Sequence, residues 1–136
     1  HLLIEVPDPQ SIFAKVLGAW WMPWFQPQHL HFMTTVIMAA ELRKVGLEPV
    51  EWHTGRANTA NDFVLSFTNM VSAWAPDPNV PWRRRASVFR RIFNGLVWIP
   101  GGIFVASGAL LDHALHPIAK RLHHSSQFRV IAKKLR

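Results

Sequence analysis

The chain has 136 residues and a formal net charge of +7, with 49% of its residues hydrophobic and only 17% charged. This length suits one small domain with a single core. Cysteine is absent, which excludes a disulfide framework and a thiolate metal site. The positive charge indicates an anionic partner, such as nucleic acid, a membrane surface or an acidic substrate, although many basic domains bind none of these.

The first segment, residues 1–6, is an apolar run that ends at Pro7-Asp8-Pro9. Its length and composition predict a buried strand of the kind found in parallel sheets. Pro7 and Pro9 cannot continue a strand ladder, so the chain is expected to turn there. Because a mature chain rarely begins inside a strand, we expect the sequence to start within a larger domain.

Two helices are predicted from the residues at their ends. Ser11 can cap a helix that runs to about Leu17 and stops at Gly18. A second helix begins at Thr34 and stops at Gly46, with basic residues in its last turn. Its predicted apolar stripe consists of Met38, Leu42 and Val45.

Between these helices, residues 20–32 (WWMPWFQPQHLHF) form an irregular segment, because Pro23 and Pro27 prevent a regular helix. The segment is rich in aromatic side chains and also contains two histidines. A loop of this composition is not expected to lie free in water. It either packs onto a sheet or covers a pocket.

Strands are also predicted at residues 47–53 and 128–135, and Pro49 indicates that the first of these is an edge strand. The region between them, residues 61–124, is expected to be helical. Its predicted parts are a helix at 61–74, with Phe63, Phe67, Met70 and Trp74 at helical spacing, a basic amphipathic stretch at 82–93, an uncharged stretch at 92–111 and a helix at 112–124.

The uncharged stretch, residues 92–111, is about as long as the roughly 20 residues that cross a bilayer. Pro100-Gly101-Gly102 is expected to interrupt it, and the chain must return to the sheet at residue 128. Both features favour a helical hairpin, re-entrant or interfacial, over a single crossing. The predicted membrane-surface residues are Trp82, Arg83, Arg84, Arg85, Arg90, Arg91 and Trp98.

Two other interpretations of the arginine cluster stay open. A solvated basic helix that covers a core has the same composition. Aromatic and basic residues side by side can also bind nucleic acid. We expect no nucleic-acid partner, because the arginines adjoin the most apolar part of the chain.

Several segments together resemble the C-terminal half of class I S-adenosylmethionine-dependent methyltransferases, in the ubiquinone-type and small-molecule branch. Residues 1–11 (HLLIEVPDPQS) resemble the strand that follows the L-x-P-G-G turn of that family. Residues 27–32 (PQHLHF) resemble its P-x-H loop, and residues 34–50 its unit of helix, Gly-Phe turn and strand. Residues 128–134 resemble its last strand.

The resemblance implies an α/β fold in which residues 1–136 form the C-terminal part of a Rossmann-like methyltransferase sheet. The three strands would be the last of that sheet, with the final strand antiparallel between the other two. The helical region 61–124 would be an insertion before the final strand. Whether this insertion associates with a membrane is left open. The family's glycine-rich turn and acidic ribose-binding residue are absent. S-adenosylmethionine would therefore be bound mainly by an N-terminal half of the same protein.

By the same resemblance, the aromatic loop would roof a site for a hydrophobic small-molecule or lipid-like methyl acceptor. His29 is the candidate catalytic residue, since a histidine can act as a base where the acceptor must lose a proton. The candidate substrate-binding residues are Trp20, Trp21, Trp24, Phe25, His31 and Phe32. Ordinary packing of the loop, with His29 bonded to its backbone, is the alternative.

No metal site is expected. His29 with His31, and His113 with His116, are only pairs, whereas zinc requires three or four converging ligands. The resemblance thus implies a methyltransferase, which we expect to be cytoplasmic, with peripheral membrane attachment left open. The alternative is a non-catalytic, basic, membrane-associated subunit of a larger assembly.

Overall fold

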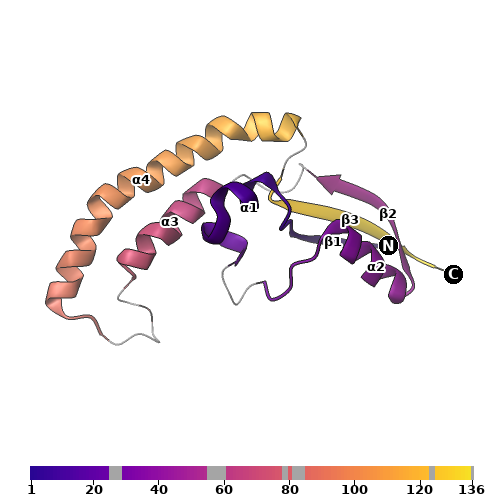
Figure 1. Cartoon of the computed structure of the whole chain (residues 1–136), viewed down its shortest axis with the longest axis horizontal. Helices are drawn as coiled ribbons and strands as arrows, with labels where there is room; N and C mark the ends of the chain where they lie inside the picture. The colour runs from indigo at the N-terminus through magenta and orange to yellow at the C-terminus, as the bar shows by residue number, and fades with distance from the viewer. Residues whose placement is uncertain (25–28, 55–60, 78–79, 81–84, 123–124, 136) are drawn as a thin grey trace.

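The computed structural model describes residues 1–24, 29–54, 61–77, 80, 85–122 and 125–135, except the side chain of residue 120. The fold is mixed α/β, with a small sheet at one end of the molecule and a curved pair of long helices that extends away from it (Figure 1). Two helices separate the second strand from the third along the chain.

The sheet consists of β1 (Leu2–Pro7), β2 (Leu47–Thr54) and β3 (Gln127–Lys134) in the order β1-β3-β2. The last strand therefore lies in the middle and runs antiparallel to both neighbours, as predicted. Every pair of neighbouring strands is antiparallel, so the described sheet is not a parallel Rossmann sheet. Pro49 lies in the edge strand β2, also as predicted, beside an irregularity in its pairing.

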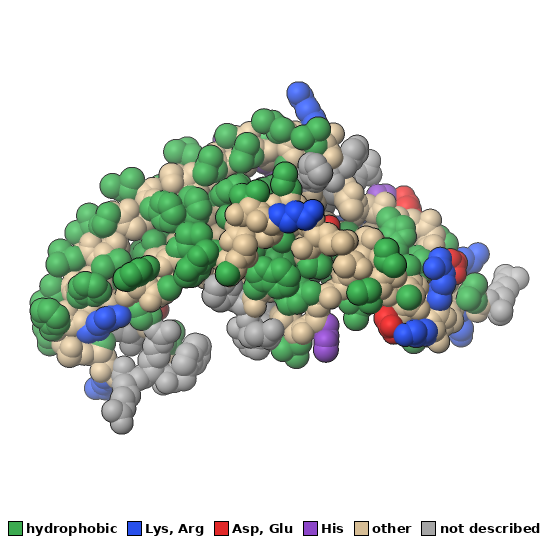
Figure 2. Space-filling model, viewed as in Figure 1, with side chains coloured by type: hydrophobic (Ala, Val, Ile, Leu, Met, Phe, Trp, Pro, Cys, Tyr) green, Lys and Arg blue, Asp and Glu red, His purple; other side chains and the backbone are tan. Residues whose placement is uncertain are grey.

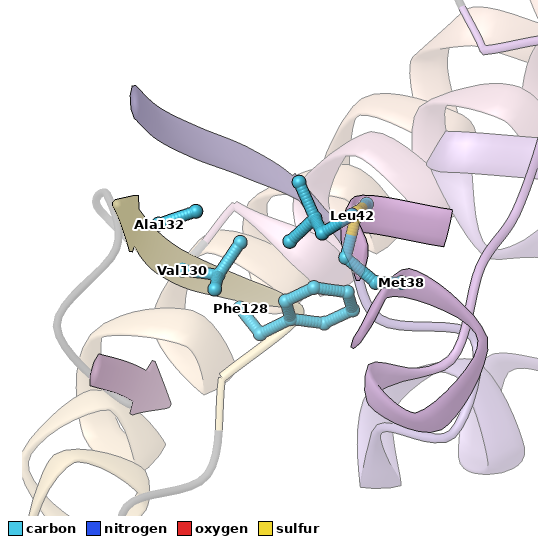
Figure 3. Packing of buried hydrophobic residues seen from close by; sticks show 5 residues of the cluster. All are labelled: Met38, Leu42, Phe128, Val130 and Ala132. Carbon is cyan, nitrogen blue, oxygen red and sulfur yellow. The ribbon is translucent and has the colours of Figure 1, made fainter. Parts of the chain in front are cut away.

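One face of the sheet carries the core. Alternate residues of β3, namely Phe128, Val130 and Ala132, are fully buried against Met38 and Leu42 of α2 (Thr35–Lys44) (Figure 3). This is the two-residue period of a strand with one dry face. Truncating a buried phenylalanine of this kind typically costs about 3–5 kcal/mol.

The opposite face of the sheet carries charged and apolar side chains and is largely solvated. Arg129 donates to Glu5 at 2.9 Å across the β1–β3 pair. Leu3, on the same face as Glu5, is 57% exposed. The prediction that residues 1–6 form a fully buried strand is therefore wrong, because helices cover only one face of this antiparallel sheet. Pro7 also lies within β1, as its last residue.

Local end signals account for the short helices. The Ser11 hydroxyl accepts from the backbone N–H of Ala14 at 3.0 Å, which caps α1 (Ile12–Leu17), and Gly18 ends that helix with a φ of 54°. Thr34 caps α2 in the same way and Gly46 ends it with a φ of 76°. Val45, predicted to face the core, is instead 71% exposed, since it lies beyond the last helical turn.

The helical region forms an antiparallel hairpin of α3 (Asp62–Trp74) and α4 (Val88–Arg121). The two helices lie side by side along the whole of α3 (Figure 1). The predicted interruption at Pro100-Gly101-Gly102 is wrong, because α4 is continuous through it. The hairpin arises from α3 and α4, and not from a turn within residues 92–111. Trp74, predicted to be on the apolar face of α3, is exposed.

Close packing on α3 explains why α4 continues past Pro100. A proline inside a helix removes one hydrogen bond and costs about 3 kcal/mol. Against this, Gly101 and Gly108 lie one above the other on the face of α4 that contacts α3, where they allow close approach. Between them the rings of Phe67 and Phe104 stack at 4.1 Å.

Gly108→Ala should destabilise the protein by about 1–3 kcal/mol, because its Cβ would overpack the helix interface. That atom would lie 2.9 Å from Cδ2 of Phe67 and 3.0 Å from the backbone of Phe63. Chemical denaturation followed by circular dichroism measures the change.

The matched control is Gly102→Ala, on the same helix, where an added Cβ meets no atom within 4 Å. This variant should be more stable than the wild type by about 0.5–1 kcal/mol, since alanine favours a helix over glycine. Equal effects of the two substitutions would contradict the close packing of the hairpin.

Candidate functional site

The aromatic loop after α1 is built around Trp21. Two single turns, η1 (Gly18–Trp20) and η2 (Met22–Trp24), place this side chain fully inside the protein. It packs in a cluster with residues of α1, α3 and the end of α4; the cluster includes Phe13, Leu17, Phe63, Phe67 and Ala119. Trp21 therefore serves as the anchor of the loop.

The outer part of the loop is more accessible. Trp24 contacts both Trp21 and Phe32, with ring centroids 5.0 Å and 4.5 Å apart. The half-buried His29 lies edge-on to Phe32 at 6.3 Å. The structure thus brings these predicted site residues together on one aromatic surface.

The other candidate residues of the loop lie differently. Trp20 is half-buried and His31 is exposed. Phe25 lies outside the described residues. Of the seven side chains predicted for the acceptor site, Trp21 is fully buried in the protein core. For this residue, the structure agrees with the alternative of ordinary loop packing.

A half-buried carboxylate, Asp62, joins the loop to the hairpin and the sheet. Its Oδ1 accepts from the indole Nε1 of Trp21 at 3.2 Å and from the hydroxyl of Ser126, just before β3. Burial raises the pKa of Asp62 above its usual value, the two donors partly offset this, and the nearby Asp112 raises it further. Asp62 therefore favours its protonated form more than an exposed aspartate does.

Asp112 of α4 caps the N-terminal end of α3. Its two carboxylate oxygens accept from the backbone N–H groups of Phe63 and Val64, at 3.1 Å and 2.9 Å. Asn61, the residue before α3, makes no side-chain capping bond. The negative charge of Asp112 also complements the positive end of the helix dipole. The partner helix therefore supplies the cap that α3 lacks in its own sequence.

The C-terminal end of α3 is held by the same helix. Arg90, Asn94 and Trp98 lie four residues apart on one face of α4. They donate in turn to the carbonyls of Trp74, Pro76 and Ala75, at 3.1 Å, 2.7 Å and 2.9 Å. The spacing of four residues places all three side chains over the last turn of α3.

The predicted membrane-surface residues are divided by this arrangement. Arg85, Arg90 and Arg91 are exposed near the tip of the hairpin. Trp98 is half-buried and faces α3, so it is not on the outer surface of α4. Trp82, Arg83 and Arg84 lie outside the described residues.

Among the described residues, α4 is long and apolar enough to cross a membrane by length and composition alone, over Val88–Ala119. Only 17% of its most apolar window is buried in the protein. No group of three potential metal-binding side chains occurs in the described ranges.

The described residues do not fit S-adenosylmethionine. The polar groups of the turn after β1 are used within the protein. The side chain of Asp8 accepts from the backbone N–H of Gln10 at 2.9 Å, and the backbone N–H of Asp8 donates to the carbonyl of Ser126 at 2.8 Å. In the described part of the chain, the glycines with positive φ are Gly18 and Gly46, and both end helices. Neither opens a helix toward a ligand, as a cofactor-binding turn does.

Sequence reasoning did not identify the structural roles of Asp62 and Asp112. The usable signal was that Asp112 is the single charge on α4 between Arg91 and residue 120. A lone charge in an apolar helix requires a buried partner.

No family model matches the chain, and comparisons with curated proteins and with solved structures found no match.

Asp112→Asn should lower the free energy of unfolding by about 1–3 kcal/mol, because an amide has one acceptor oxygen for two buried N–H donors. Urea denaturation measures this loss. Glu41→Gln makes the same change in charge at an exposed ion pair with Lys44. It should change stability by less than about 0.5 kcal/mol. A loss of the same size in both variants would contradict the capping role.

Asp62 should make the stability of the protein depend on pH. Since its pKa is raised on folding, its contribution to stability is greatest below the usual value of 3.8 and is lost as pH rises through the folded value. Asp62→Asn keeps an acceptor oxygen but cannot ionise. The stability of this variant relative to wild type should therefore rise between about pH 3 and pH 7. A difference that stays constant over that range would contradict the assignment.

Proposed function

We propose that this chain is the acceptor-side part of an S-adenosylmethionine-dependent methyltransferase that acts on a hydrophobic small molecule or lipid-like compound. The observation that carries the proposal is the strand order β1-β3-β2, with the last strand antiparallel in the centre. The resemblance to class I methyltransferases implies that order for the end of the sheet. No simple succession of hairpins generates it, because β1 and β2 run parallel to each other.

The open edge of β1 supports a continuation of the sheet. In the described residues β1 pairs only with β3, and its other edge has no partner strand. In native proteins, an unpaired strand edge with exposed apolar residues such as Leu2 and Leu3 is usually covered by another part of the protein. On this proposal, further strands of the same polypeptide cover it and hold the cofactor, which the described residues do not fit.

The loop that follows the carboxyl end of β1 is the proposed acceptor site. Ligands of open α/β sheets bind beyond the carboxyl ends of the strands. There Trp24 and Phe32 offer an apolar surface, and His29 lies beside it. Alignment of the acceptor supplies most of the rate in a methyl transfer. His29 would accept a proton from an acceptor that must lose one.

The second candidate is a non-catalytic, membrane-associated subunit whose sheet is completed by another polypeptide. The exposed apolar surface of α4 favours it. The two candidates differ in the partner of β1. A longer polypeptide that binds the cofactor supports the enzyme, whereas a separate protein paired with β1 supports the subunit.

The test is methyl transfer by the polypeptide that contains this chain together with the segment preceding β1. The assay uses S-adenosylmethionine labelled in the methyl group and a panel of prenylated phenols as acceptors. His29→Ala should lower kcat by about 10²–10⁴-fold for an acceptor that loses a proton, with the Kd for the cofactor unchanged.

His113→Ala, an exposed histidine on α4, is the control and should leave kcat unchanged. The proposal fails if the longer polypeptide binds no S-adenosylmethionine. A normal kcat in the His29→Ala variant would contradict the role of His29 as the proton acceptor, but it would not contradict the proposed methyl transfer.

A further inference from the structure

The outer face of α4 is a continuous apolar stripe with no partner in the described structure. Hydrophobic side chains cover much of this helix on the visible side of the molecule (Figure 2). The stripe recurs at spacings of three and four residues, and Ile103 near its middle is 73% exposed. Its largest members are Phe89, Ile92, Leu96, Ile99, Ile103 and Leu110.

Basic side chains flank the stripe at both ends. Arg85 and Arg91 are exposed near the tip of the hairpin, where Arg90 donates to the carbonyl of Trp74 on the α3 side, and Arg121 is exposed at the end of α4. From residue 80 to the C-terminus the sequence has eleven basic residues and one acidic residue, Asp112. Asp112 is buried on the opposite side of α4, under α3. The exposed stripe therefore has cations at both ends and no competing anion.

The hairpin is poorly suited to crossing a bilayer. The apolar core of a bilayer is about 30 Å thick, whereas the 13 residues of α3 span only about 20 Å. Because β2 and β3 both lie at the base of the hairpin, a crossing would carry its tip to the far side (Figure 1). The arginines of the tip would then have to pass through the bilayer, which is costly.

A second copy of the chain is also a poor occupant of the stripe. Two α4 helices packed antiparallel would bring the tip arginines of one copy close to Arg121 of the other. Parallel packing would bring identical arginine clusters together. Both arrangements place like charges next to each other, which opposes association.

We propose that α4 lies flat on an anionic lipid bilayer. In this orientation the stripe enters the boundary between headgroups and acyl chains, and the flanking arginines contact lipid phosphates. The inner face of α4 stays packed on α3. The proposal does not require methyl transfer, so its failure would leave the proposed function standing.

Flotation with vesicles tests the proposal. The protein should bind vesicles of phosphatidylcholine and phosphatidylglycerol, and bind those of phosphatidylcholine alone at least about tenfold more weakly. The double variant Ile99→Glu, Ile103→Glu should lose at least about tenfold in partitioning. Both positions are exposed, so folding should be kept, as circular dichroism will verify.

Val36→Glu is the matched control, an exposed apolar residue on α2 exchanged for the same acidic side chain. It should bind the vesicles as the wild type does. Equal loss in the control and the double variant would overturn the proposal, and so would equal binding of the double variant and the wild type.

The depth of the helix distinguishes a flat orientation from a crossing. Because residues 1–136 contain no cysteine, a single one can be introduced and labelled with an environment-sensitive fluorophore. Labels at Ile92, Ile99 and Leu110 should all report shallow depths with spin-labelled lipids, deepest near the middle because the outer face of α4 is convex (Figure 1). A steady change of depth along these positions would overturn the proposal, as would a dimer in solution that the double variant dissociates and that binds no vesicles.

Discussion

The hairpin depends on one interaction more than on any other: α4 holds both ends of α3. Asp112 accepts from the first free N–H groups of α3, and Arg90, Asn94 and Trp98 donate to carbonyls at its last turn. The charges match the helix dipole, negative at its N-terminal end and positive at its C-terminal end. A helix of 13 residues is marginal in water by itself. The partner helix removes that weakness by satisfying groups that α3 cannot satisfy through its own flanking residues.

The second constraint connects this hairpin to the rest of the protein. Asp62 opens α3 and also accepts from Trp21 of the aromatic loop and from Ser126 before β3. One carboxylate thus fixes three parts of the chain that are far apart in sequence. Its partial burial raises its pKa, and the nearby Asp112 raises it further. Both carboxylates are positioned by contacts within the fold, so neither is aimed at a ligand.

Much of the fold was predictable because its signals are local. Ser11, Thr34, Gly18 and Gly46 determine where α1 and α2 begin or end, and the alternation in β3 identifies its buried face. The course of α4 was not predictable in this way. A local rule ends a helix near Pro100, whereas packing of Gly101 and Gly108 on α3 carries the helix through. For the candidate site, sequence reasoning named Trp24, His29 and Phe32, and the rings of Trp24 and His29 lie against Phe32 in the structure. It did not distinguish them from Trp21, because the partner of that indole is 41 residues away.

The aromatic loop and the apolar stripe lie on opposite sides of the helical hairpin. Ala119, near the end of α4, packs against the cluster that holds Trp21, whereas the stripe faces outward. A helix with its side chains is about 10–12 Å across. The turns of the loop pack on α3, which in turn packs on the part of α4 that carries the stripe. On the proposed orientation, two helices, or roughly 20 Å, would therefore separate the lipid from Trp24 and Phe32. A bilayer-soluble acceptor would be concentrated close to the loop by this orientation, but it would have to leave the acyl layer to reach the aromatic surface.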